Sequence, residues 1–341
     1  MKKVKTEDAV GLTLCHDITE VRDGFKGCAF KRGHIVTAED IPHLLDLGKK
    51  HLFIWEENAG EIHEEDAALR LAALAPMENA VYTGPSEGKM TLTAMEDGLF
   101  RVNRPLLDAI NQIGDITVVT LPDHYPVTKG AKLAGERIIP LVCPEAEIEQ
   151  AEAMVRAADR PLMELLPYRR DLPVGIVVTG SEVYSGRIKD KFEPVVRAKV
   201  APFGANVLGC IFCDDYIEML DAAIARWKER GAKLIVMTGG MSVDPDDLTA
   251  TAIRRSGAQV VTQGVPAQPG NMFTVAYLDD VTILGVPGAA IHAQTTMLDV
   301  VLPQVFTGLP FTYEDLRRMG AGGLCQNCPE CHYPNCTFGL Y

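Results

Sequence analysis

Hydrophobic and polar positions change their period near residue 172. Beyond that point, short apolar runs of strand length alternate with amphipathic stretches of helical period. We expect helices over 191–203, 217–230, 248–256 and 290–303, and strands over 174–179, 207–213, 234–238, 259–262, 273–278 and 281–284. This alternation predicts an α/β fold of three layers, in which helices cover both faces of a mostly parallel sheet.

The first 170 residues show shorter and more varied elements, typical of a smaller, β-rich α+β region. Apolar spacing predicts helices over 37–48, 64–75, 103–113 and 145–160, and strands over 50–55, 90–95, 116–121 and, as a pair, 127–143. We therefore expect four parts. They are a small N-terminal α/β region (1–58), an α+β region with a helical connector (59–170), the α/β domain (171–310) and a tail (311–341).

Three of the predicted strands end in glycine or proline turns: Thr179-Gly-Ser-Glu182, Thr238-Gly-Gly-Met-Ser242 and Gly285-Val-Pro-Gly288. In parallel sheets, ligands bind beyond the carboxyl ends of the strands, and glycine lets a ligand approach the backbone closely. After the second turn, Asp244 suits a helix N-cap and Pro245 the first helical position. A helix that begins there offers free N–H groups to an anion.

Asp244, Asp246 and Asp247 place three carboxylates beside that expected anion site. Carboxylates repel a bare phosphate, but they hold a hard divalent cation such as Mg²⁺ that bridges to it. Complementing the helix dipole explains Asp246 and Asp247 equally well. The segment alone leaves the two interpretations open.

Composition restricts the class of protein and of ligand. The 341 residues are 47% hydrophobic and 23% charged, which is typical of a globular chain. No apolar run has the length of a membrane span and the N-terminus lacks an apolar signal core, so we expect a cytoplasmic protein. The net charge of −13 argues against nucleic-acid and anionic-membrane partners. An anionic small ligand therefore has to be bound by groups at its own site, such as backbone N–H groups, a few basic side chains or a metal.

The turns, in this order and at domain-wide spacing, resemble the molybdopterin-binding domain of molybdopterin adenylyltransferases and molybdopterin molybdenumtransferases. The resemblance covers about 172–307 and is carried by the segments 178–183, 186–190, 238–249, 269–270 and 285–288; a looser likeness extends to 9–17, 30–36 and 127–130. It implies binding of molybdopterin or adenylylated molybdopterin in molybdenum or tungsten cofactor biosynthesis. It further implies Mg²⁺-dependent metal insertion from molybdate, and a homodimer.

The resemblance also assigns roles to individual residues. It places the pterin phosphate on Gly239, Gly240 and Ser242, and Mg²⁺ near Asp244 and Asp247. Asp190 is the second acidic position, which makes Asp190 and Asp247 the candidate catalytic residues. The remaining residues that it assigns to cofactor binding are Thr179, Gly180, Ser181, Glu182, Pro269, Gly270, Pro287 and Gly288.

The chain departs from the molybdenumtransferase pattern at three positions. Ser181 stands where an Asp is usual, and Gln268 and Asn271 stand where lysines flank Pro269-Gly270. Loss of cations beside a triphosphate or molybdate removes charge stabilisation. A non-catalytic carrier or sensor of the cofactor is therefore an alternative. A nucleotide pyrophosphatase acting on ADP-ribose-like substrates is another, because 238–249 also resembles the domain that opens the nicotinamide-nucleotide amidohydrolases.

Four of the nine cysteines crowd the end of the chain in a CxxCxxCx₄C pattern: Cys325, Cys328, Cys331 and Cys336. Four thiols are enough for a tetrahedral Zn²⁺ or an iron–sulfur cluster. The CxxCxxC run is more typical of ferredoxins than of zinc fingers, although the fourth cysteine lacks the following proline. We predict a metal-binding tail, leave its metal open, and hypothesise that the tail contacts a molybdoenzyme partner.

Overall fold

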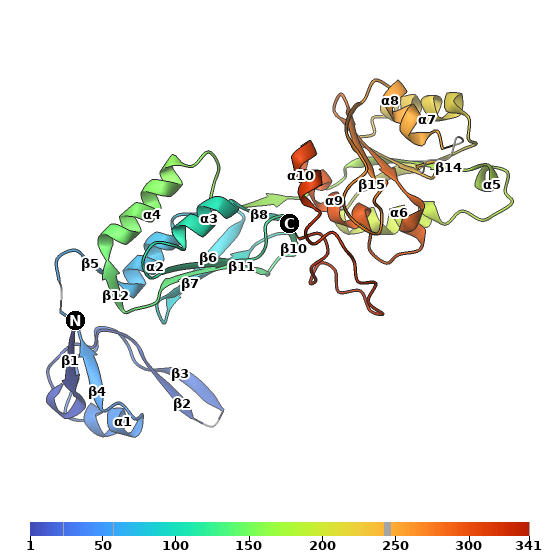
Figure 1. Ribbon diagram of the computed structural model, residues 1–341. Helices are drawn as coiled ribbons and strands as arrows, with labels where there is room; N and C mark the ends of the chain where they lie inside the picture. The colour runs from blue at the N-terminus through green and yellow to red at the C-terminus, as the bar shows by residue number, and fades with distance from the viewer. Residues whose placement is uncertain (23, 57, 242–246, 341) are drawn as a thin grey trace. The chain divides into compact units, whose positions relative to one another are not determined.

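The computed structural model describes residues 1–22, 24–56, 58–241 and 247–340 (Figure 1). The chain forms two compact units, and unit 2 includes two short segments that lie within the sequence of unit 1. Unit 1 comprises Met1–Glu96, Val102–Leu121 and Lys129–Glu164, and unit 2 comprises Asp97–Arg101, Pro122–Thr128 and Leu165–Tyr341. None of the helices in the described ranges combines the length and apolar character needed to cross a bilayer.

Unit 1 opens with a small module around a compact apolar core. Strand β1 (Lys2–Lys5) pairs antiparallel with β4 (His51–Ile54), and β2 (Ile18–Arg22) forms a hairpin with β3 (Phe25–Phe30). Helix α1 (Asp40–Asp46) lies within the range predicted for it, and its Leu44 is buried with Leu14 and Leu52. The apolar spacing of this segment thus serves a core of its own.

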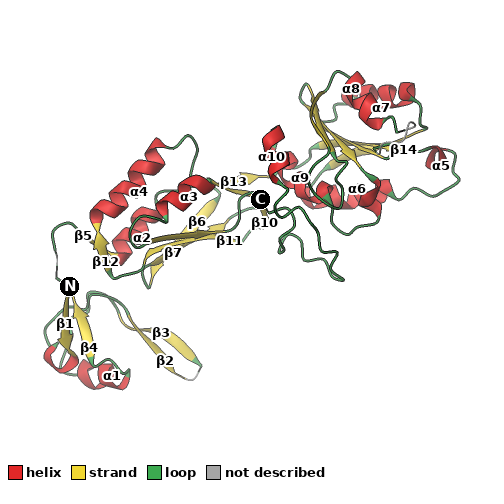
Figure 2. Cartoon of the chain, in the orientation of Figure 1, coloured by secondary structure: helices red, strands yellow, loops and turns green. Residues whose placement is uncertain are grey.

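The rest of unit 1 is an antiparallel sheet with the strand order β6-β7-β11-β9. These strands are β6 (Ala80–Ser86), β7 (Lys89–Ala94), β9 (Ile116–Thr120) and β11 (Lys132–Ile138), and a separate pair joins β5 (Glu61–His63) to β12 (Val142–Pro144). Helices α2 (Glu64–Ala72), α3 (Arg104–Ile110) and α4 (Glu145–Ala157) lie on one side of the sheet (Figure 2). The predicted helices are confirmed, and each ends three residues before the expected position.

A three-stranded sheet of order β10-β8-β13 joins segments that are distant in sequence. Its strands are β8 (Gly98–Val102), β10 (Tyr125–Val127) and β13 (Met163–Pro167). Gly98 sits where a Cβ atom would lie 2.5 Å from the Leu166 carbonyl oxygen, so the backbones approach too closely there for any other residue.

Unit 2 contains a six-stranded sheet of order β15-β14-β16-β19-β18-β17. The strands are β14 (Pro173–Thr179), β15 (Asn206–Cys213), β16 (Leu234–Thr238), β17 (Gln259–Gln263), β18 (Thr274–Leu278) and β19 (Val281–Val286). Strands β15, β14, β16 and β19 run parallel, whereas β18 and β17 run antiparallel to their neighbours. The predicted α/β fold with a mostly parallel sheet is confirmed.

Helices cover both faces of this sheet, which gives the expected three layers (Figure 1). Helices α7 (Ile217–Glu229) and α8 (Thr249–Arg255) pack on one face, where Ile224, Trp227 and Ile253 are buried. Helices α6 (Phe192–Val200), α9 (Met297–Thr307) and α10 (Tyr313–Arg318) pack on the other. All five residues of β16 are buried, as a central strand covered on both sides requires.

The last strands are antiparallel because only Asp279 and Asp280 separate β18 from β19, too short a connection for a parallel crossover. Two expectations about the starts of helices need correction. The helix expected from 290 begins only at Met297, after a 3₁₀ turn at Gly288–Ile291. The helix expected to open at Pro245 begins at Thr249, with Leu248 at its N-cap. The proposed cap, Asp244, lies outside the described residues.

Candidate functional site

The register of the sheet brings the predicted turns to one edge. Thr179 lies beside Cys213, Val178 beside Thr238, and Thr238 beside Val286, so the parallel strands β14, β15, β16 and β19 end together. The loop from β17 to β18, which contains Pro269-Gly270, opens at the same edge because Thr274 pairs with Gly285 and with Gln263. Predicted turns that are far apart in sequence therefore share one end of one sheet.

The Gly239–Gly240 turn is the most closely packed part of this edge. Both glycines have positive φ, +85° and +55°, which side chains rarely adopt. A Cβ on Gly239 would lie 2.6 Å from Thr179 Oγ1, and one on Gly240 would lie 2.8 Å from Thr249 Oγ1. Thr249 fixes the turn from the other side, since its hydroxyl donates to the Gly239 carbonyl at 2.9 Å and its N–H to the Gly240 carbonyl at 3.2 Å.

Thr179 itself carries a polar atom that the fold leaves unused. Thr179 is 3% exposed, and its Oγ1 has no hydrogen-bond partner among the described residues. Since a buried hydroxyl without a partner costs stability, such an atom beside a two-glycine turn is suited to a ligand. Gly180 follows with φ of +132°, and Glu182 is exposed on the short helix α5 (Ser181–Tyr184).

Two acidic residues that the sequence analysis missed meet Ser181 at this edge. Asp214 and Asp215 follow directly after β15, and the Asp215 carboxylate accepts the Ser181 N–H at 3.0 Å. The Ser181 hydroxyl donates to Asp214 and lies 3.3 Å from Asp215 Oδ2. Ser181, and then the Asp215 N–H, hold the pKa of the Asp214 carboxyl below its ordinary value. Two carboxyl groups therefore stand beside Ser181, the residue at the position where the resemblance leads us to expect an Asp.

The acidic residues predicted to be catalytic lie in different surroundings. Asp247 has a buried Oδ2 without a hydrogen-bond partner in the described part of the chain. Asp190 instead accepts the N–H groups of Phe192 and Glu193, at 2.8 and 2.9 Å, at the start of α6. This geometry gives Asp190 a helix-capping role. Ser242 and Asp244 lie outside the described residues.

Of the two remaining predicted turns, the one at Pro269-Gly270 lies against the end of the chain. Gly270 packs on the start of α9, where a Cβ would lie 3.3 Å from the Met297 nitrogen. Gln268 pairs through its backbone with the tail, accepting the Cys325 N–H at 2.9 Å and donating to Gly323 at 2.8 Å. Pro287 and Gly288 begin the 3₁₀ turn. Residues 292–295, in the loop after this turn, line a cavity together with the tail cysteines.

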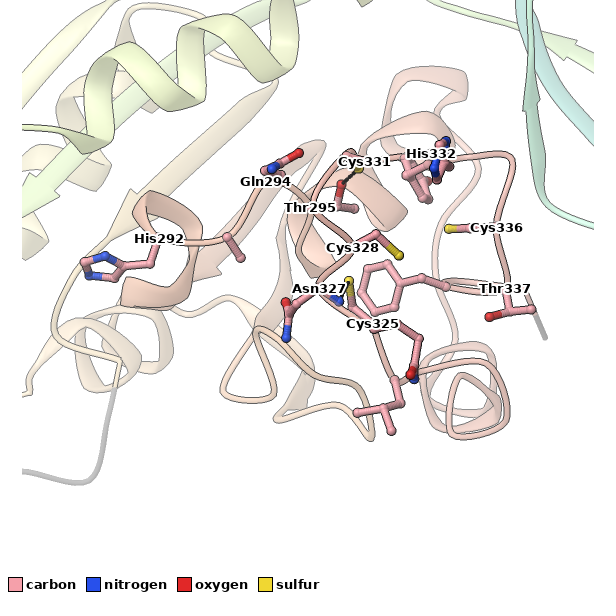
Figure 3. Close-up of a pocket in the computed structure, with 15 residues that line it drawn as sticks. His292, Gln294, Thr295, Cys325, Asn327, Cys328, Cys331, His332, Cys336 and Thr337 are labelled. Carbon is pink, nitrogen blue, oxygen red and sulfur yellow. Dashed lines mark hydrogen bonds between the residues drawn. The ribbon is translucent and has the colours of Figure 1, made fainter.

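The cysteines of the tail line one cavity of about 190 Å³, together with residues of that loop (Figure 3). Cys328 and Cys331 are exposed, and Cys325 and Cys336 are half-buried. No group of three or more His, Cys, Asp or Glu side chains in the described ranges converges closely enough for a single metal ion.

Sequence families match this chain in two segments. Residues 175–307 match a family described as a probable molybdopterin binding domain. Unit 2 therefore carries a molybdopterin-binding domain. Residues 3–56 match a different family, described as a domain of unknown function (DUF8806).

Curated relatives match part of this chain. A molybdopterin molybdenumtransferase from Synechococcus elongatus is 26% identical over 141 residues, which cover 38% of this chain and 35% of that protein. A CinA-like protein from Mycobacterium tuberculosis is 32% identical over 81 residues, which cover 24% of this chain and 19% of that protein. The chain thus spans about a third or less of these relatives.

Solved structures also align with part of the chain. The molybdopterin biosynthesis enzyme MoaB from Thermus thermophilus aligns with 42% of this chain and 99% of its own, at 18% identity and a TM-score of 0.34. The protein CinA from Thermoplasma acidophilum aligns with 35% of this chain and 89% of its own, at 13% identity and a TM-score of 0.30.

Proposed function

We propose that unit 2 binds molybdopterin or its adenylylated form in a step of molybdenum or tungsten cofactor biosynthesis. The observation that carries the proposal is the edge of the sheet, where the predicted turns end together and the Gly239–Gly240 turn packs against a Thr179 hydroxyl that has no hydrogen-bond partner among the described residues. In this proposal the pterin phosphate lies on the Gly239–Gly240 turn. Backbone N–H groups suit an anion in a chain whose net charge is −13.

We also propose Mg²⁺ as the cation at this edge. Mg²⁺ is usually bound by one or two carboxylates together with ligand phosphates, and not by a cage of protein groups alone. Asp214, Asp215 and the unpartnered Oδ2 of Asp247 are donors of that kind. The cation would neutralise phosphate charge, which matters more here because Gln268 and Asn271 stand where the relatives are expected to carry lysines.

Titration of the purified protein with molybdopterin, and separately with its adenylylated form, tests the proposal. Asp247→Asn keeps the shape of the side chain and removes its charge, so we expect about tenfold weaker binding in the presence of Mg²⁺ and little change without it. Gly240→Val should abolish binding, because the Cβ of the new side chain would lie 2.8 Å from Thr249 Oγ1 and displace the turn.

Gly257→Val is the matched control, since Gly257 also has positive φ, +86°, but has open space around it. It should bind both ligands as the wild-type protein does. Equal affinity of all variants for both ligands, or no binding by the wild type, contradicts the proposal.

Catalysis and carriage are separated by a second measurement. If the protein inserts metal, Mg²⁺ and molybdate should release AMP from bound adenylylated molybdopterin, whereas a carrier or sensor should keep the ligand intact. A homodimer and a molybdoenzyme partner stay predictions; light scattering on the purified protein tests the first.

One other candidate is a nucleotide pyrophosphatase, because residues 238–249 also resemble the domain that opens the nicotinamide-nucleotide amidohydrolases. In that case the Gly239–Gly240 turn would hold a pyrophosphate instead of a pterin phosphate. Turnover of ADP-ribose by the wild-type protein, lost in Asp247→Asn, would replace the cofactor proposal by this one.

A further inference from the structure

The Cys-rich segment, residues 325–336, is a loop held in place by contacts and not by regular structure. Apart from the single bridge between Leu324 and Gln268, the described residues from 319 to 340 contain no strand or helix. Phe338 is buried near the end of the chain. The next residue, Gly339, packs against α9, because a Cβ there would lie 2.8 Å from Val300. Such a loop, with four thiols, gains a defined shape when a metal centre joins them.

The thiols face a common space. Figure 3 shows the four cysteines around one cavity, with Thr295 beside Cys331 and Gln294 close by. Its volume is about 190 Å³. All four cysteines are free thiols, so no disulfide accounts for their proximity.

Hydrogen bonds already orient two of the sulfur atoms. The Asn327 N–H lies 3.5 Å from Cys325 Sγ, a contact within the CxxC turn, and Asn327 has a positive φ of +51° that closes this turn. The Thr295 hydroxyl lies 2.9 Å from Cys331 Sγ. Hydrogen bonds to sulfur ligands orient them and tune a metal centre.

The size of the cavity favours a cluster over a single ion. In a tetrahedral zinc site each Zn–S bond is about 2.3 Å, so the sulfurs lie ~3.8 Å apart and leave no room between them. The described side chains do not converge to single-ion spacing, and the four thiols instead line a cavity of about 190 Å³, which leaves room for a cluster between them. His332 also lines the cavity and is exposed.

We propose that the four thiols of the Cys-rich segment ligate one iron–sulfur cluster. The segment is bonded to both loops that flank the proposed cofactor site: Gln268 pairs with Leu324 and Cys325, and Gln294 and Thr295 bond to Pro329 and Cys331. The cluster therefore also fixes the loops 266–271 and 292–296. This inference concerns a site separate from the pterin edge and does not depend on which ligand binds there.

Metal analysis of the full chain, purified without oxygen and reconstituted with ferrous iron and sulfide, tests the site. We expect iron and acid-labile sulfide in equal amounts, about two to four of each per chain, with visible absorption typical of a cluster. Cys328→Ser should lose most of both. Cys28→Ser, which removes an exposed thiol of unit 1, should lose neither.

Zinc in place of iron in the wild type, or iron and sulfide retained in Cys328→Ser, would overturn the proposal. Mössbauer spectra of the wild type give a readout that does not depend on the folding of a variant, since iron in a cluster shows tetrahedral sulfur coordination. Hydrogen exchange over 266–271 and 292–296 should slow several-fold in the loaded protein. Unchanged exchange would refute the link to the loops.

Discussion

At the scale of single residues, the Gly239–Gly240 turn combines two constraints. Positive φ alone costs a non-glycine residue about 1 kcal/mol, and a Cβ on Gly239 would also lie 2.6 Å from Thr179 Oγ1. We expect Gly239→Ala to lower the free energy of unfolding by ~2–4 kcal/mol. Gly257→Ala has the same positive φ in open space and should cost only ~1 kcal/mol. Urea unfolding followed by circular dichroism measures both, and equal losses would mean that crowding at the turn plays no part.

The sequence identifies these glycines but not the acidic pair Asp214 and Asp215 that meets Ser181 at the same edge. A Gly-Gly pair after an apolar run has few uses other than a tight turn, so its role is visible locally. Asp214 and Asp215 precede a predicted helix, where a carboxylate is ordinary, and their partner Ser181 lies 33 and 34 residues away. Only the pairing of β14 with β15 brings the three together.

Glu136, in unit 1, is a buried carboxyl that titrates near neutral pH. It is fully buried on β11, its Oε1 accepts the Tyr82 hydroxyl at 3.0 Å, and its Oε2 has no hydrogen-bond partner among the described residues. Burial raises its pKa to about 7. A carboxyl whose pKa is higher in the folded than in the unfolded state stabilises the protein fully below the unfolded pKa, and this stability is lost as pH rises through about 7.

The free energy of unfolding should therefore fall by up to ~3 kcal/mol between pH 5 and pH 8 because of Glu136. Glu136→Gln keeps the shape and removes the charge, so it should flatten this part of the pH profile and stabilise the protein at pH 8. Chemical unfolding at several pH values, with both proteins side by side, is the measurement. Parallel profiles would show that Glu136 does not titrate in this range.

At the scale of elements, one contact fixes helix α7 on the sheet of unit 2. The ring of Trp227 lies over Gly175 on β14, where a Cβ would lie 2.5 Å from it, and its Nε1 donates to the Ile176 carbonyl at 3.0 Å. Gly175→Ala should therefore displace the helix and lower the free energy of unfolding by ~1–3 kcal/mol. Gly135→Ala, on a strand where the nearest atom lies 3.6 Å away, is the control and should cost much less. A similar loss in both would show that strand glycine itself, and not the Trp227 contact, sets the effect.

The start of α9 shows why some elements could not be located from periodicity. Apolar residues run through the loop into the helix, so their spacing predicts a helix from 290. The deciding signal is a capping box, in which the Thr296 hydroxyl and the Asp299 carboxylate bond each other's backbone and begin the helix at Met297. Residues 292–295, which the helix therefore does not include, line the cysteine cavity, which the sequence could not indicate.

At the scale of the whole molecule, the fold class was predictable because alternating strands and helices leave few arrangements of a parallel sheet. The assignment of segments to the two units was not predictable. Segments 97–101 and 122–128 join unit 2 although they lie within the sequence of unit 1. Periodicity divides a chain into consecutive parts, whereas the place of these two segments in unit 2 depends on the long-range pairing of β8, β10 and β13.

The two tryptophans allow ligand effects to be assigned to each unit. Trp55 lies in unit 1 and Trp227 in unit 2, and the chain has no others. Since the proposed pterin site and the cluster belong to unit 2, a ligand at about 100 times its Kd should stabilise that unit by ~2.7 kcal/mol and leave unit 1 unchanged. Urea unfolding of Trp55→Phe, followed by fluorescence, reports unit 2 alone, and the difference from the wild type reports unit 1. A shift of both transitions together would mean that the units unfold as one, and binding at one edge would then stabilise the entire chain.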